Sequence, residues 1–248
     1  MSMSTTNPTF GRLASPSAAA PRAWRFLLRA AVGVALATTI VGLLHMPFAA
    51  PLLRAITPSW ACPIRRGTPE QIDRAHAMGA ANIRANARES APARPALGFA
   101  LDTTTRGDIR AWASKNGVSC AAIGGNDNLQ KCTNVPAAAV GQPAAYGPLE
   151  EITFELRATG ELVNVQTMRR GLTAEAAATI AGDLEARMRA SLGEPTQRGG
   201  EPTAAHLSHG VLSTFVAVHQ FTDYRATVTA TNLAGTGTMV REEYLSAR

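Results

Sequence analysis

The hydrophobic positions of the chain form one long apolar run followed by short amphipathic segments. The run extends from Ala30 to Leu53 and contains no formally charged residue. A helix rises about 1.5 Å per residue, so a segment of this length can cross a hydrocarbon core of about 30 Å. Arg29 and Arg54 bound the run, and no acidic residue precedes Glu70. Because a basic flank before such a run stays in the cytoplasm, we expect residues 30–53 to be an uncleaved signal anchor.

This topology divides the chain into four parts. We expect residues 1–29 to be a disordered, basic cytoplasmic tail and residues 30–53 to be the transmembrane anchor. Residues 54–95 are expected to form a linker and a stalk helix, and residues 96–248 a periplasmic domain. The protein is then a single-pass protein of a bacterial inner membrane, with the lipid bilayer as a partner through residues 30–53.

Two other interpretations of the N-terminal region stay open. A cleavable signal peptide would use residues 32–44 as its apolar segment, with Ser59-Trp60-Ala61 as a cleavage site. An organellar transit peptide agrees with the Ser, Thr, Ala and Arg content of residues 1–29, which lack acidic residues. The signal peptide would place the domain in the same compartment as the anchor does.

Three helices are predicted after the anchor from capping residues and apolar faces. Thr68, Pro69 and Gln71 mark the first helix start, because Thr at the N-cap and Gln at N3 make a capping box. Its apolar stripe is weak, which favours a stalk lying over the domain. The helices are predicted over residues 69–87, 106–116 and 173–193.

Alternating apolar and polar residues predict the strands. Ile152, Phe154 and Leu156 alternate with polar residues, as in a half-buried strand. Strands are predicted over residues 97–101, 118–123, 129–135, 152–156, 162–168, 211–221, 223–231 and 238–245. Because consecutive strands are joined by short turns, we expect an α+β fold: a mostly antiparallel sheet with helices packed on one face, preceded by a single N-terminal transmembrane helix. The order lacks the βαβα rhythm and Gly-rich phosphate loop of a nucleotide-binding sheet.

The charge balance removes nucleic acid from the expected partners. The whole chain has a formal charge of +6 and a sequence pI near 9.9. Residues 1–66 contain seven Arg and no acidic residue, so residues from Gly67 onward carry 17 basic against 18 acidic residues. Topology and attraction to anionic lipid explain basic residues that flank an anchor. The near-neutral domain therefore gives no charge-based reason to expect a nucleic-acid partner.

Cys120 and Cys132 carry the strongest local chemical signal. They are equidistant in sequence from Asn126, the centre of a predicted turn. In a hairpin centred there they lie directly opposite each other, at a separation that a disulfide accepts. An oxidising compartment outside the cytoplasm would allow the bond to form. Cys62 then remains unpaired, which leaves two alternatives open: a link between two chains of a homodimer, or an unreactive thiol.

The candidates for catalysis and metal binding are weak. His206, His209 and His219 are the only cluster that suggests a metal, because two imidazoles separated by two residues can share an ion. No HExxH frame accompanies them and they do not fall on one predicted helix face, so solvated loop histidines are the preferred interpretation. No Gly-x-Ser-x-Gly nucleophile elbow occurs. We expect no catalytic residue and no cofactor.

The end of the third predicted helix carries a family resemblance. The sequence Leu192-Gly193-Glu194-Pro195-Thr196, followed by meandering strands, resembles the β-lactamase-inhibitor-like and outer-membrane assembly lipoprotein envelope domains. Leu97-Gly98, before the helix at residues 108–116, resembles the start of an earlier copy. The chain departs from that group because it has no lipobox around Cys62. The resemblance implies an α+β envelope domain that binds proteins rather than catalysing reactions.

These observations lead to one expected function and two alternatives. The chain is expected to be a membrane-anchored periplasmic module that binds another envelope protein, or organises an assembly, through a sheet face or an edge strand. The first alternative is a hydrolase that uses the His206, His209 and His219 group. The second is a small-ligand-binding domain that uses a concave sheet face.

Overall fold

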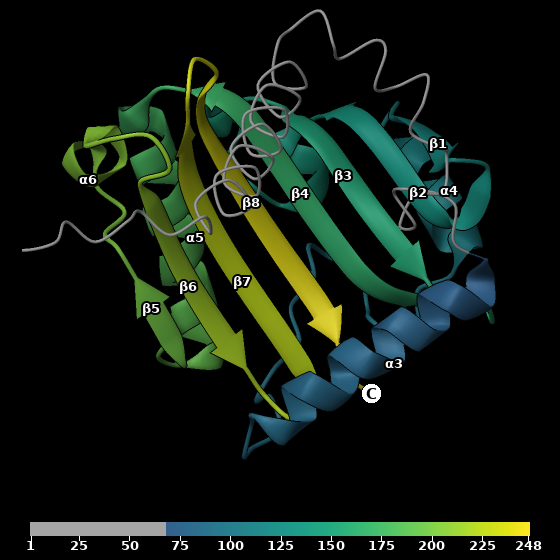
Figure 1. Ribbon diagram of the computed structural model, residues 1–248. Helices are drawn as coiled ribbons and strands as arrows, with labels where there is room; N and C mark the ends of the chain where they lie inside the picture. The colour runs from purple at the N-terminus through teal and green to yellow at the C-terminus, as the bar shows by residue number, and fades with distance from the viewer. Residues whose placement is uncertain (1–67) are drawn as a thin grey trace, which may run out of the picture. The chain divides into compact units, whose positions relative to one another are not determined.

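The computed structural model describes residues 68–248 (Figure 1). The expectations for the tail, the anchor at residues 30–53, the cleavage site and Cys62 concern residues outside this range. Between residues 68 and 248, no helix combines the length and the apolar character needed to span a membrane.

The centre of the fold is one sheet of eight strands, all paired antiparallel. The spatial order is β1-β2-β3-β4-β8-β7-β6-β5. The strands are β1 (Ser119–Ile123), β2 (Asn126–Val135), β3 (Leu149–Leu156), β4 (Leu162–Leu172), β5 (Gln197–Gly199), β6 (Thr214–Gln220), β7 (Tyr224–Leu233) and β8 (Gly237–Ser246). The expected α+β fold with an antiparallel sheet is therefore confirmed.

The helices begin where the sequence places its capping residues. They are α3 (Pro69–Ala85), α4 (Arg106–Lys115), α5 (Ala174–Leu192) and α6 (Ala204–Ser208), with short 3-10 helices η2 (Ala137–Val140) and η3 (Ala144–Tyr146) between β2 and β3. Thr68 and Thr105 each start a capping box, and the Thr173 hydroxyl accepts from the backbone N–H of Ala176. These caps satisfy backbone donors that have no partner within the helix.

The element order repeats once along the chain. Helix α4 precedes the meander β1-β2-β3-β4, and helix α5 precedes β5-β6-β7-β8. The last strands of the two meanders, β4 and β8, pair side by side in the centre of the sheet. The first strands, β1 and β5, therefore occupy the two outer edges.

One face of the sheet carries the hydrophobic core. Inward residues alternate along each strand, as Ile152 and Phe154 do on β3, and they form a single cluster with Ile109 of α4 and Leu184 of α5. Phe99, Trp112 and Phe154 add three edge-to-face ring contacts with centroids 4.9–5.7 Å apart. Helices α4 and α5 thus cover the same face of the sheet.

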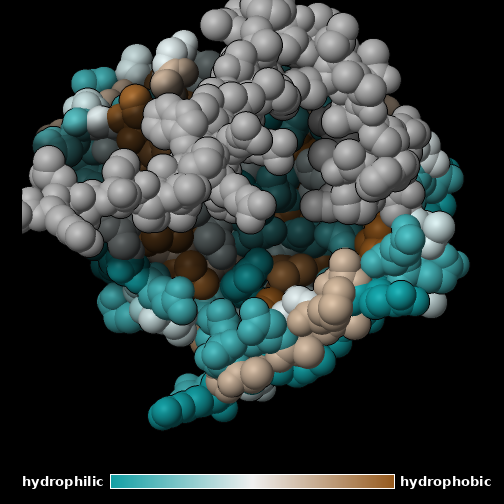
Figure 2. All heavy atoms as spheres, viewed as in Figure 1, coloured by the Kyte–Doolittle hydropathy of each residue, from teal (hydrophilic) through white to brown (hydrophobic). Residues whose placement is uncertain are grey.

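Helix α3 packs elsewhere, at one end of the strands (Figure 1). Its buried residues Ala80 and Ile83 contact Ala247 and Leu245. Successive side chains of a strand point to opposite faces of the sheet. Tyr244 points into the main core, so its neighbour Leu245 points to the opposite face. The outer side of α3 presents exposed Ala75 and Met78. Figure 2 shows pale hydrophobic atoms along this helix.

Three local predictions differ from the structure. The strand expected at residues 97–101 is a series of turns, in which Leu97 and Asp102 have positive φ. An Asp can occupy this region at modest cost, whereas Leu there is uncommon and held by its surroundings. Strand β5 and helix α6 lie between the helix predicted over residues 173–193 and the strand predicted over residues 211–221, where the sequence predicts neither element. Both are too short for a periodic pattern to reveal them.

Candidate functional site

Strand β1 forms an open edge of the sheet. It pairs with β2 on one side, and no described strand pairs with its other side. Its sequence Ser-Cys-Ala-Ala-Ile contains no charge and no proline. Proteins normally protect such edges with charged side chains, prolines or covering segments, because unpaired backbone groups attract another strand.

The disulfide shows which backbone groups of β1 face outward. Cys120 and Cys132 are bonded and directly opposite in the β1–β2 ladder, as the sequence predicted. Their Cα atoms are 4.0 Å apart. That separation belongs to a narrow, non-hydrogen-bonded pair, in which both residues turn their N–H and C=O groups away from each other. Cys120 and Ala122, two residues on, therefore point these groups toward the open edge.

The opposite edge is protected. Strand β5 has only three residues, and its central Arg198 is engaged by two acidic side chains. The Arg198 Nε lies 2.7 Å from Oε1 of the buried Glu185, and its Nη1 lies 3.0 Å from Glu201. A short edge with a fixed charge resists the addition of another strand. The two edges occupy equivalent positions in the repeated order, so the contrast between them is a specific feature of β1.

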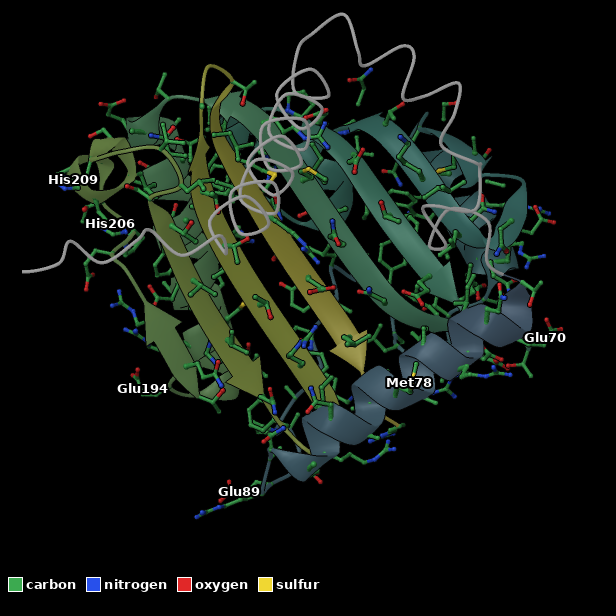
Figure 3. All side chains as sticks on the ribbon, viewed as in Figure 1. Glu70, Met78, Glu89, Glu194, His206 and His209 are labelled. Atoms are coloured by element: carbon green, nitrogen blue, oxygen red, sulfur yellow. A yellow bond between two sulfur atoms is a disulfide. The ribbon has the colours of Figure 1, made fainter. Side chains whose placement is uncertain are left out.

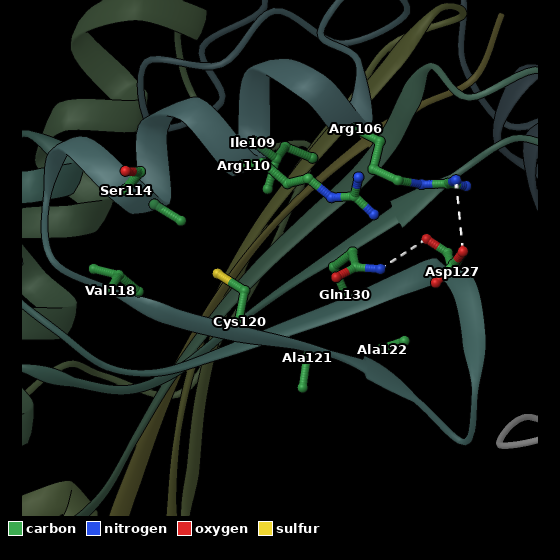
Figure 4. Close-up of a pocket in the computed structure, with 11 residues that line it drawn as sticks. Arg106, Ile109, Arg110, Ser114, Val118, Cys120, Ala121, Ala122, Asp127 and Gln130 are labelled. Carbon is green, nitrogen blue, oxygen red and sulfur yellow. Dashed lines mark hydrogen bonds and ion pairs between the residues drawn. The ribbon is translucent and has the colours of Figure 1, made fainter.

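A groove runs beside the open edge, between α4 and the β1–β2 hairpin (Figure 4). Its volume is about 410 Å³. Buried Ile109 and Ala113 of α4 face Cys120 and Ala122 of β1 across it. Its polar lining consists of Arg106, Arg110, Ser114, Asp127 and Gln130. Such a mixture of apolar floor and convergent polar groups is typical of a binding site.

The two arginines of the groove differ in their partners. The Arg106 Nη2 donates to Oδ1 of Asn128 at 2.6 Å, and its Nη1 lies 3.8 Å from Asp127. Arg110, one helical turn later, makes no hydrogen bond or ion pair with any residue between 68 and 248, and its guanidinium extends into the groove (Figure 4). The groove therefore holds one compensated and one uncompensated positive charge.

The structure separates the three histidines that suggested a metal site. His206 lies on α6 and His209 caps its end (Figure 3). The His206 Nε2 lies 3.1 Å from the carbonyl oxygen of Thr214, at the start of β6. His219 is fully buried near the other end of β6, about 17 Å farther along at the usual strand rise. No group of three His, Cys, Asp or Glu side chains in residues 68–248 is arranged to hold a metal ion.

A buried polar network lies in the core beneath α5. The Glu242 carboxylate accepts hydrogen bonds from the Tyr244 hydroxyl and from Gln142 Nε2 at 2.6 Å. Gln142 in turn accepts from Arg169 Nη2 at 2.6 Å. Burial raises the pKa of Glu242 and of Tyr244. Both carboxylate oxygens are already occupied by protein donors, so this network serves the packing of the core.

A second polar cluster, at the C-terminal end of β8, contains Ser, His and Asp without forming a catalytic triad. The Ser246 hydroxyl donates to Asp102 at 2.7 Å and is fully buried. The His76 Nε2 lies 2.9 Å from the Ser246 carbonyl oxygen. A nucleophilic serine needs an imidazole on its hydroxyl. Here the hydroxyl is held by a carboxylate, and the cluster fixes the chain end.

The sequence predicts the disulfide, but it does not single out Arg110 or the outward backbone groups of Ala122. For Arg110, the spacing of two arginines on one helix is a signal that could have identified it. Arg106 and Arg110 stand four residues apart, and like charges at this spacing destabilise a helix by a few tenths of a kcal/mol. The sequence does not show that β1 is an edge strand of the sheet, because its place depends on the pairing of β4 with β8.

Comparison with known proteins gives little further information. No family model matches the chain, and no curated protein matches it. The crystal structure of a DUF4309 family protein (YjgB) from Bacillus subtilis is similar with a TM-score of 0.31 and 12% sequence identity, over 71% of this chain and 96% of that one. A similarity at this level carries no conclusion about function.

Proposed function

We propose that the domain is a protein-interaction module that binds an extended segment of another envelope protein by strand addition along β1. The open, uncharged edge of β1 carries this proposal. Its outward N–H and C=O groups offer the same hydrogen bonds that pair the strands of the sheet. Main-chain bonds of this kind supply affinity in strand-addition complexes, and neighbouring pockets for side chains supply specificity.

The small side chains and the fixed position of β1 favour addition of a partner strand over contact through a flat surface. Ser119, Ala121 and Ala122 have small side chains that leave room for an incoming chain. The Cys120–Cys132 bond ties the edge strand to β2, so little order must be gained on binding. The rigid edge and the adjacent groove together form a preorganised surface.

The proposed location outside the cytoplasm has one support in the sequence and one in the structure. Residues 30–53 form an uncharged run of membrane-spanning length. The domain carries a disulfide, and disulfides persist in oxidising compartments. The partner is then a protein exposed to the same compartment.

The test uses a substitution that blocks the edge without touching the β1–β2 ladder. Ala122→Pro removes an outward N–H and places a ring where an added strand would lie. A photoreactive residue at Ala121 in the full-length, membrane-bound chain is expected to crosslink to a defined partner, and Ala122→Pro is expected to abolish that product. We expect the melting temperature of this variant to remain close to that of the wild type.

Two controls make the result specific. Ala121→Thr, tested with the photoreactive residue at Ser119, alters a side chain of the same strand but keeps every backbone donor, so its crosslink is expected to remain. A photoreactive residue at Glu201, beside the protected β5 edge, is expected to miss the partner. A product that persists in a folded Ala122→Pro chain contradicts strand addition.

A further inference from the structure

We infer that the strand captured by β1 carries an acidic side chain, Asp or Glu, which enters the α4–β1 groove and pairs with Arg110. This inference rests on the proposed strand addition and names the chemistry of its partner. It concerns the groove beside the edge, whereas the edge itself supplies only main-chain hydrogen bonds that any sequence can make.

The charge of the groove selects the sign of the ligand. Arg110 is exposed, extends into the groove, and has no acidic partner among residues 68–248 (Figure 4). Arg106 lies on the same side of α4. It forms a hydrogen bond with Asn128 and an ion pair with Asp127 at its own end of the groove. Two arginines at this spacing repel each other within one helix. A ligand carboxylate placed between these two arginines and strand β1 would offset the repulsion between their positive charges.

The hydrogen-bond inventory of the groove points the same way. Two buried donors near it, Arg106 Nε and Asn128 Nδ2, have no acceptor within the described part of the chain. Arg110 adds a guanidinium whose donors contact no acceptor in the described part of the chain. These donors of the groove and its surroundings therefore lack acceptors among residues 68–248. A carboxylate brings acceptor capacity without adding a donor, and its bonds to guanidinium groups are charge-assisted.

The geometry of strand addition delivers a side chain to this place. Cys120 and Ala122 point their side chains toward the groove, and both line it. In an added antiparallel strand, the residue opposite Ala122 would point its side chain to the same side of the sheet, about 5 Å away. Because Ala122 is small, that side chain has access to the 410 Å³ groove and to the Arg110 guanidinium across it.

The charge of the chain itself argues against two other occupants. Residues 1–66 contain seven Arg and no acidic residue, so this segment offers no carboxylate to Arg110. A second copy pairing through its own β1 would present Ser-Cys-Ala-Ala-Ile, which is uncharged. The ligand that fits is a segment of a different protein with an acidic residue in an extended stretch.

The test measures how peptide charge affects binding. The probes are fluorescent peptides of about eight residues, alternating Thr and Val, with Glu, Gln or Lys at the centre. We expect the full-length protein in detergent micelles to bind the Glu peptide about tenfold more tightly than the Gln peptide, by fluorescence anisotropy. Arg110→Gln is expected to remove this preference, and Arg110→Glu to transfer it to the Lys peptide.

Lys115→Gln is the matched control, because it removes the same charge from α4 outside the groove lining. It is expected to keep the preference for Glu. Equal binding of the Glu and Gln peptides, or equal effects of Arg110→Gln and Lys115→Gln, would overturn this inference alone. If no peptide binds, or if Ala122→Pro binds them all as the wild type does, strand addition itself is overturned.

Discussion

At the residue scale, His219 is the clearest case of a side chain whose charge state is set by the fold. It lies on the inner face of β6 and is fully buried, and neither ring nitrogen has a hydrogen-bond partner among residues 68–248. Glu185, Arg189 and Glu194 are the charged groups that influence it. Burial is the largest effect and lowers the pKa of His219. The residue is therefore neutral in the folded domain, where it acts as part of the core.

This state predicts a loss of stability in acid. Below about pH 6.5 the unfolded chain binds a proton at His219 that the folded chain does not bind, so the free energy of unfolding falls as pH falls. The limiting slope, reached where only the unfolded chain is protonated, is about 1.4 kcal/mol per pH unit, and the fall is measured between about pH 6.5 and pH 5. Urea unfolding of wild type and His219→Leu at both ends of this range measures the effect. The slope is expected to be shallower in His219→Leu, and equal slopes would contradict the assignment.

The disulfide cysteines and Arg110 show which functional residues the sequence could and could not predict. The pairing of Cys120 with Cys132 followed from their equal spacing about a turn. Arg110 did not stand out, because an arginine on an amphipathic helix is usually solvated. Its importance depends on the lack of an acidic partner among residues 68–248, and that lack becomes visible only in the folded structure.

At the element scale, long periodic segments were predicted well and short ones were not. Helix α5 has nineteen residues, a Thr cap and a Gly after its end, and its predicted extent matches the structure closely. The hairpin of β1 and β2 has the expected register from Ser119 to Ala122. A bulge then shortens the turn to Gly124-Gly125, both with positive φ. Glycine tolerates that conformation, so the five-residue turn expected from composition is tighter in the structure.

The disulfide makes a prediction for the same element. In the chain-entropy model, a crosslink that closes a loop of this length stabilises the fold by about 3 kcal/mol. The double variant Cys120→Ala/Cys132→Ala is expected to lose up to that amount in urea unfolding, with fraying that begins at β1. Reducing the wild type should give the same loss. A reduced wild type as stable as the oxidised protein would show that the bond contributes nothing.

At the scale of the whole molecule, the fold is two matched halves joined through β4 and β8. Local patterns predicted most strands of each half, but they contain no information on which strands of different halves meet. The pairing of β4 with β8 makes β1 an edge, and that placement gives the uncharged sequence of β1 its meaning. The sequence therefore could not predict the candidate site, although it did predict the disulfide beside that site.

Hydrogen exchange at the backbone amides of β1 tests the central claim most directly. In the free protein, the outward N–H groups of Cys120 and Ala122 are expected to exchange rapidly, while those of Ser119 and Ala121 in the β2 ladder are protected. Adding the Glu-containing peptide is expected to slow exchange at Cys120 and Ala122. Binding that leaves both amides unprotected would contradict strand addition along β1.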